Sequence, residues 1–151
     1  MADIVPGANA NPKAMFTRDA AVVLGIASTA MPFARSSESQ AERWLRVLRA
    51  HGEAGVVLKS LGVSEATVRD VDSEDAGRAP DPDVSERGDV VADVTERAAE
   101  IARGRGAPTV GTLDVLVAAM QVYGVAFDRV LEAHGTSRRA VMVKLSAELG
   151  I

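Results

Sequence analysis

The sequence repeats part of itself, and this duplication constrains the fold more than any other feature. The stretch from Leu58 to Val68 returns as the stretch from Leu131 to Val141, with leucine, glycine, serine and valine at matching positions. The apolar stripe that follows Phe16 to Ala20 likewise returns after Val84 to Gly88. A repeat of about seventy residues is too long for a solenoid unit. It favours two copies of a small helical bundle whose cores complete each other.

The composition permits one compact domain and excludes several chemistries. With 151 residues, 47% of them apolar, the chain is long enough to bury a core. It has no cysteine, so disulfides, thiolate nucleophiles and cysteine-ligated metals are excluded, and a reducing compartment is expected. The formal charge of -4 and the 3% of aromatic residues disfavour nucleic acid as a partner, because phosphate neutralisation and base stacking supply much of that affinity.

We expect no targeting signal in the N-terminal residues. Residues 1–14 contain prolines, glycine and asparagines without apolar periodicity, and we expect them to form a mobile tail. They lack a basic start followed by an apolar run, and no stretch approaches the roughly 18 apolar residues of a membrane span. The expectation is a cytoplasmic protein that does not enter a membrane.

Residues 15–75 predict a first repeat of four helices. Apolar residues step by three and four along each helix, and residues suited to capping or breaking helices separate them. These start and stop residues are Thr17, Pro32, a capping box made by Ser39 and Glu42, Gly62, and Ser64.

Residues 84–151 predict a second repeat of four helices. An acidic segment with proline and glycine, residues 76–83, separates it from the first and is predicted to be a solvated linker. The start and stop residues of the second repeat are Ser85, Gly104, Gly106, Thr112, Gly135, and Ser137 or Thr136. No segment alternates apolar and polar residues as a strand does, so the predicted fold class is all-α with eight helices.

The ordered set of motifs over residues 15–149 resembles the double Clp-N repeat, the N-terminal domain of Clp-type AAA+ unfoldases. That family opens each repeat with F-T-x-R-A, starts the second helix with G-T-E-H and closes the third with Leu-x-x-Leu-Gly-Val. The matching segments here are Phe16-Thr17, Ala41-Glu42-Arg43, Leu58 to Val63, Val84-Ser85 and Gly111-Thr112-Leu113-Asp114. The resemblance implies two four-helix repeats related by a pseudo-twofold axis.

The resemblance also implies a non-catalytic docking surface for proteins and peptides: an unfoldase, its adaptors or its substrates. Some bacterial members bind phosphorylated arginine near the glutamate of each G-T-E-H motif, and certain cyclic peptide antibiotics dock on the same domain. Glu42 is retained here, but Leu113 replaces the second glutamate, so the resemblance implies at most one such site. The sequence has no G-x-x-x-x-G-K-[ST] phosphate loop, so we expect an adaptor, a regulator, a ligand-sequestering decoy or a diverged module rather than the motor.

Glu42, Gly111 and Thr112 are candidates for ligand binding, and Glu42 and Thr112 each have a structural alternative. Glu42 either completes the capping box with Ser39 or contacts a ligand. Thr112, next to Gly111, either caps its helix or helps to hold an anion at the helix start.

The predicted partner surface contains Phe16, Trp44 and Val84. Trp44 is either a core residue or the border of a peptide groove. Phe16 and Val84 open the two repeats and are expected to meet across the pseudo-twofold seam, where an exposed side chain makes a natural docking site.

No catalytic residue, metal site or cofactor is expected. His51 and His134 each precede a glycine at a predicted helix end, where an imidazolium ion interacts favourably with the helix dipole, and no clustered ligands accompany them. No serine lies in a G-x-S-x-G elbow, so we do not expect an enzyme.

A DNA-binding regulator is the alternative function. The stretch from Leu58 to Arg69 reads like a helix-turn-helix with a glycine turn. The recognition helix of this motif would span residues 65–75, which contain five acidic side chains that phosphates would repel. The second copy is less unfavourable for DNA binding because it carries Arg138, Arg139 and Lys144.

Overall fold

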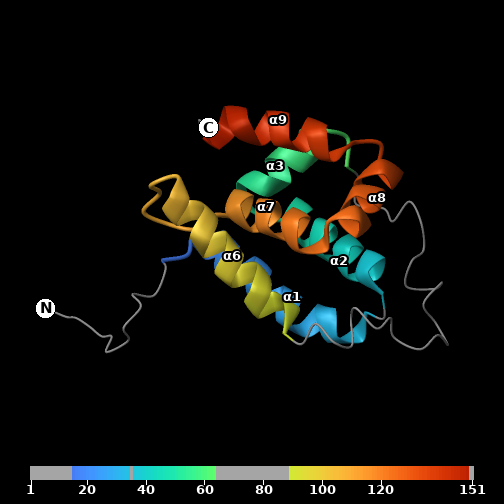
Figure 1. The fold of residues 1–151 in the computed structure, drawn as a ribbon, viewed down its shortest axis with the longest axis horizontal. Helices are drawn as coiled ribbons and strands as arrows, with labels where there is room; N and C mark the ends of the chain where they lie inside the picture. Colours follow the sequence, from blue (N-terminus) through green and yellow to red (C-terminus); the bar gives the residue numbers. More distant parts are fainter. Residues whose placement is uncertain (1–14, 35, 64–88, 150–151) are drawn as a thin grey trace, which may run out of the picture.

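The computed structural model describes residues 15–34, 36–63 and 89–149. Over these residues the fold is all-α, as predicted, and the one extended pairing among them is an isolated parallel bridge between Phe16 and Val110. The helices in Figure 1 are α1 (Arg18–Ala30), the 3-10 turn η2 (Met31–Phe33), α2 (Ser37–Arg49), α3 (Gly52–Ser60), α6 (Val90–Gly104), α7 (Thr112–Tyr123), α8 (Val125–Ala133) and α9 (Arg138–Leu149). The predicted tail, the predicted helix after Ser64, the linker and Val84 lie outside the described residues.

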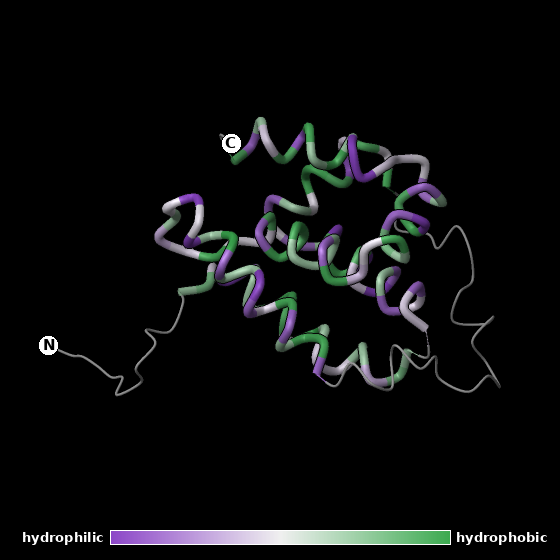
Figure 2. The backbone as a smooth tube through the Cα atoms, in the orientation of Figure 1, coloured by the Kyte–Doolittle hydropathy of each residue, from purple (hydrophilic) through white to green (hydrophobic). Residues whose placement is uncertain are grey.

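Helix α7 is the centre of the fold. Ten of its twelve residues are buried, and it contacts α1, α2, α3, α6 and α8. Figure 1 shows α3 and α9 on one side of α7 and α1 and α6 on the other. Hydrophobic residues predominate along α7 in Figure 2. The other helices are therefore arranged around one nearly apolar helix, with α9 packed on the outer side of α3.

The starts of α1 and α2 test the predicted caps. Thr17 caps α1 as predicted, because its hydroxyl accepts the Ala20 N–H at 3.1 Å. The predicted Ser39/Glu42 capping box is wrong. Ser36 has the extended backbone of an N-cap and accepts the Ser39 N–H at 3.0 Å, so Ser39 lies inside the first turn of α2.

The starts of α6 and α7 also lie at residues other than the predicted caps. Asp89 caps α6 by accepting the Ala92 N–H at 3.1 Å, and the predicted cap Ser85 lies outside the described residues. At α7 the N-cap is Gly111 and Thr112 is the first helical residue, so the prediction that Thr112 caps its own helix is wrong. The hydroxyl of Thr112 is engaged with another helix.

The ends of α3 and α8 are built identically. In each, the third residue beyond the helix closes a wide turn: Val63 N–H donates to the Leu58 carbonyl and Thr136 N–H to the Leu131 carbonyl, both at 3.0 Å. The intervening Gly62 and Gly135 have φ of 90° and 84°, a region that favours glycine. The sequence repeat is thus also a structural repeat at this turn.

Candidate functional site

Glu42 lies in the interior of the molecule. It is 3% exposed, and both carboxylate oxygens face Nε2 of His134, at 3.1 and 3.0 Å. Nε of Arg46, one turn along α2, lies 3.7 Å from the same carboxylate. The candidate ligand-binding carboxylate thus joins α2 to the end of α8, and it occupies none of the solvent-facing surface that a phosphoarginine would need.

His134 has a different role from the one predicted. It is the C-cap residue of α8, but its buried imidazole faces Glu42 rather than the end of its own helix. His51 is the N-cap residue of α3, and its side chain makes no capping hydrogen bond. In the part of the chain that the structure describes, no group of three or more histidine, aspartate and glutamate side chains is arranged to hold a metal ion.

Trp44 is a core residue joined to α7 by a buried hydrogen-bond chain. Its indole N–H donates to the Tyr123 hydroxyl at 2.9 Å, and that hydroxyl donates to Oε1 of Gln40 at 2.8 Å. Trp44 is fully buried. The alternative in which Trp44 borders a peptide groove is therefore wrong, because the indole is enclosed by side chains and its one donor is satisfied.

Gly111 lies in a turn held by an ion pair. Asp114 accepts the Gly111 N–H at 3.0 Å and receives two hydrogen bonds from the Arg105 guanidinium, at 2.9 and 2.7 Å. These hydrogen bonds raise the pKa of Arg105 above its ordinary value. The start of α7, where the free N–H groups of a helix end were predicted to hold an anion, thus already contains a buried carboxylate.

Thr112 caps α3 rather than α7. Its hydroxyl accepts the Ala54 N–H at 3.0 Å, and Ala54 lies in the first turn of α3. Gly52, with φ of 63°, lies against the same hydroxyl, and a Cβ there would come within 2.8 Å of Oγ1. The hydroxyl supplies the bond that the side chain of His51 does not make.

Phe16 is partly buried and packs against the core. It lies in the bridge in which Thr17 N–H donates to the Val110 carbonyl at 2.9 Å and Val110 N–H donates to the Met15 carbonyl at 2.7 Å. Phe16 was predicted to contact Val84, but Val84 lies outside the described residues. The partner surface at this seam stays a prediction.

The most unusual surface is one that sequence reasoning missed. Fifteen consecutive residues, from Ala20 to Ala34, carry no charge. Helix α1 and η2 nevertheless lie at the surface, and Val22, Ile26 and Phe33 are exposed, with Phe33 at 76%. We call these three residues the α1 face. The signal that could have revealed it is the missing polar side of an otherwise regular helix pattern.

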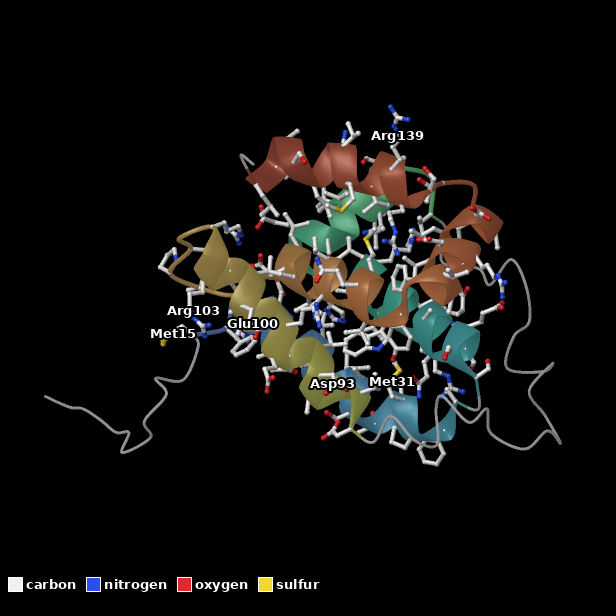
Figure 3. All side chains as sticks on the ribbon, in the orientation of Figure 1. Met15, Met31, Asp93, Glu100, Arg103 and Arg139 are labelled. Atoms are coloured by element: carbon white, nitrogen blue, oxygen red, sulfur yellow. The ribbon has the colours of Figure 1, made fainter. Side chains whose placement is uncertain are left out.

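A hollow of about 380 Å³ lies where α1 and η2 meet the starts of α2 and α6. It is defined here as the seam hollow, lined by Ser28, Met31, Pro32, Gln40, Asp89, Val90 and Val91. Figure 3 shows the labelled Met31 and Asp93 at this end of the molecule, from η2 and α6 respectively. Apolar walls with a few polar groups are the usual lining of sites that receive a side chain or a small ligand.

No described helix has the length and apolar character needed to cross a membrane. Comparisons with protein-family models, with curated proteins and with solved structures found no match.

Proposed function

We propose that this chain is a non-catalytic protein- or peptide-binding module of the kind that the Clp-N domain represents. The observation that carries the proposal is the α1 face. An exposed helix side that lacks charge over fifteen residues is costly to keep in water and is typical of a docking surface. A partner that covers this side of α1 removes no charged side chain of the helix from water, except those in the first turn.

The chemistry of the surface indicates what kind of partner it receives. Phe33, Val22 and Ile26 supply the apolar centre. Interfaces of this type concentrate their binding energy on a few apolar and aromatic anchors within a polar rim. An unfolded segment with a large apolar side chain therefore fits this surface.

The packing of the helices supports the two-repeat arrangement. Helix α2 packs on α8 while α7 packs on α3, and α1 contacts α6, as exchange about a pseudo-twofold axis requires. The matching turns after α3 and α8 add to this likeness. Under the proposal the partners are a Clp unfoldase, its adaptors or substrates, or cyclic peptides, met in the cytoplasm. The module then acts as an adaptor, a regulator or a decoy.

An NMR titration tests the proposal. We expect casein, which is permanently unfolded, or a Clp unfoldase stripped of its own N-domains, to shift the amide resonances of α1, η2 and the seam hollow. Phe33→Glu should weaken binding at least tenfold by placing a charge at the apolar centre. The matched control is Val56→Glu on α3, where the side chain is 68% exposed but far from this surface.

Two outcomes contradict the proposal. Either no binding to both probes is detected, or Phe33→Glu and Val56→Glu weaken binding equally. A circular dichroism spectrum of each variant establishes that the helices remain. ATP hydrolysis or peptide cleavage that is lost on a point mutation of the chain would also overturn the non-catalytic assignment.

A further inference from the structure

A second surface, unlike the first in charge, lies at the opposite side of α7 from α1, between the end of α3 and the helix α9 (Figure 1). A cleft of about 460 Å³ opens there. We call it the α9 cleft, lined by Leu61, Ser137, Arg139, Ala140, Val143 and Lys144. Its two charged lining residues are both cations, whereas the chain as a whole has a formal charge of -4.

The two cations of the cleft face solvent. Arg139 and Lys144 are both exposed, and Figure 3 shows Arg139 projecting from α9 away from the helical core. Their neighbour Arg138 is engaged elsewhere, because its Nε donates to Asp128 at 2.8 Å and its Nη2 to the Met120 carbonyl at 3.3 Å. The positive charge of the first turns of α9 is thus divided between Arg138, which is bonded to α8 and α7, and two exposed cations that line the cleft.

An apolar anchor lies between these cations. Val143 is 65% exposed, and Leu61, from the end of α3, is half-buried beside it. Ala140, one turn before Lys144, keeps the floor of the cleft shallow and apolar. No acidic side chain is among the lining residues, although Glu148 follows Lys144 by one turn of α9. The cleft therefore complements an apolar group that has negative charge on both sides.

We propose that the α9 cleft binds a short acidic peptide whose single large apolar side chain contacts Leu61 and Val143 while its carboxylates pair with Arg139 and Lys144. Opposite charges at the rim steer such a peptide to the cleft and fix its register, and the apolar contact supplies the desolvated centre. The site is separate from the α1 face, so it neither requires nor excludes binding there.

The N-terminus of α9 adds to the same preference. Ser137 caps the helix by accepting the Ala140 N–H at 3.1 Å, and no acidic residue lies in the first turn. The positive end of the helix dipole thus adds to the charge of Arg139, which lines the cleft. These groups attract a carboxylate, and a basic or purely apolar peptide gains nothing from them.

Fluorescence anisotropy with the full chain tests the inference. The probe is a labelled ten-residue peptide of aspartates and glutamates with one central leucine, and the comparison peptide replaces its acids by lysines. We expect the acidic probe to bind, its affinity to fall at least fivefold as salt is raised from about 50 to about 500 mM, and the basic peptide not to bind.

Matched variants locate the site. Lys144→Glu should weaken the acidic probe at least fivefold, whereas Arg97→Glu, the same charge change at an exposed position on α6, should change it less than twofold. Val143→Ser should weaken it several-fold, and Val125→Ser, at a residue of similar exposure (63%), should not. All four residues face solvent, so the variants are expected to fold.

Three results would overturn the inference. They are the absence of acidic-probe binding at low salt, equal losses in the cleft and control variants, and displacement of the acidic probe by duplex DNA that binds more tightly. The last result would assign the cations to the DNA-binding alternative. Loss of casein binding in Phe33→Glu with retention of the acidic probe would show that the two surfaces act separately.

Discussion

Helices α2 and α7 each bury a carboxylate, but the two carboxylates are paired at very different distances along the chain. Asp114 on α7 is bound by Arg105 and by the N–H of Gly111, nine and three residues away. Glu42 on α2 faces His134, 92 residues away. One carboxylate therefore fixes a local turn, and the other fastens the first half of the chain to the second.

The same contrast extends to the other polar groups of α2. Trp44 and Gln40 both meet Tyr123, and Glu38 lies 3.3 Å from Arg129 at the surface. Apart from the Tyr123 hydrogen bonds that it shares with α2, helix α7 is held in the core chiefly by apolar packing, and its Thr112 hydroxyl accepts a hydrogen bond from α3. A helix can thus be positioned by long-range polar pairs or by burial, and the two modes predict different responses to mutation.

The largest effect is expected at Trp44. Trp44→Ala should lower the free energy of unfolding by about 3–5 kcal/mol, because it leaves a cavity between α2 and α7 and removes the donor to Tyr123. Urea denaturation followed by circular dichroism measures the loss. Trp44→Phe keeps most of the packing and should cost less. A loss below about 1 kcal/mol in Trp44→Ala would contradict the core role of this residue.

The next effect is expected at the local ion pair. Asp114→Ala should lower the free energy of unfolding by about 2–4 kcal/mol, since it leaves Arg105 and the Gly111 N–H without their partner. The cost is below that of a fully buried pair because the Arg105 side chain is partly exposed. In hydrogen exchange, the start of α7 should lose protection before α2 does. Equal loss of protection in both helices would contradict the local character of the pair.

A smaller effect is expected where α2 meets α8. Glu42→Gln and His134→Gln should each cost about 1–3 kcal/mol, and the double mutant should cost clearly less than their sum because both remove one interaction. The coupling is measured from the four urea midpoints and slopes. Additive losses would show that the short Glu42–His134 distance carries little net energy.

The smallest effect is expected at the surface link between the same two helices. Arg129→Ala should change the free energy of unfolding by at most about 0.5 kcal/mol, because the Arg129 side chain is largely exposed and its contact with Glu38 is screened. Thermal unfolding at low and high salt checks this. If the free energy of unfolding fell by more than about 1 kcal/mol, the surface contact between Glu38 and Arg129 would contribute substantially to holding α2 against α8.

The sequence predicts the helices well where the signal is local. Thr17, Gly62, Gly106 and Gly135 act at helix ends as predicted, because a cap or a positive φ is set by residues only a few positions apart. The start of α2 was missed because several neighbouring serines suit the same role. Which of them caps depends on how the chain leaves η2, and this is decided by packing.

The candidate site was harder to predict for the same reason. The partners of Glu42, Trp44 and Thr112 lie 58 to 92 residues away, and no periodicity indicates which distant residue a buried polar group meets. The α1 face was detectable from its missing charges, although the seam hollow needs the start of α6 beside it. The α9 cleft likewise requires Leu61 from α3.

The hydrogen bond from Ala54 to Thr112 has a consequence for the order in which the protein folds. The first turn of α3 is completed by a hydroxyl 58 residues later, so this turn gains its bond only after the intervening chain has closed into a loop. We expect the contact to be absent from the rate-limiting transition state. Thr112→Val should therefore speed unfolding and leave the refolding rate nearly unchanged in stopped-flow experiments, whereas slower refolding would place the bond in the folding nucleus.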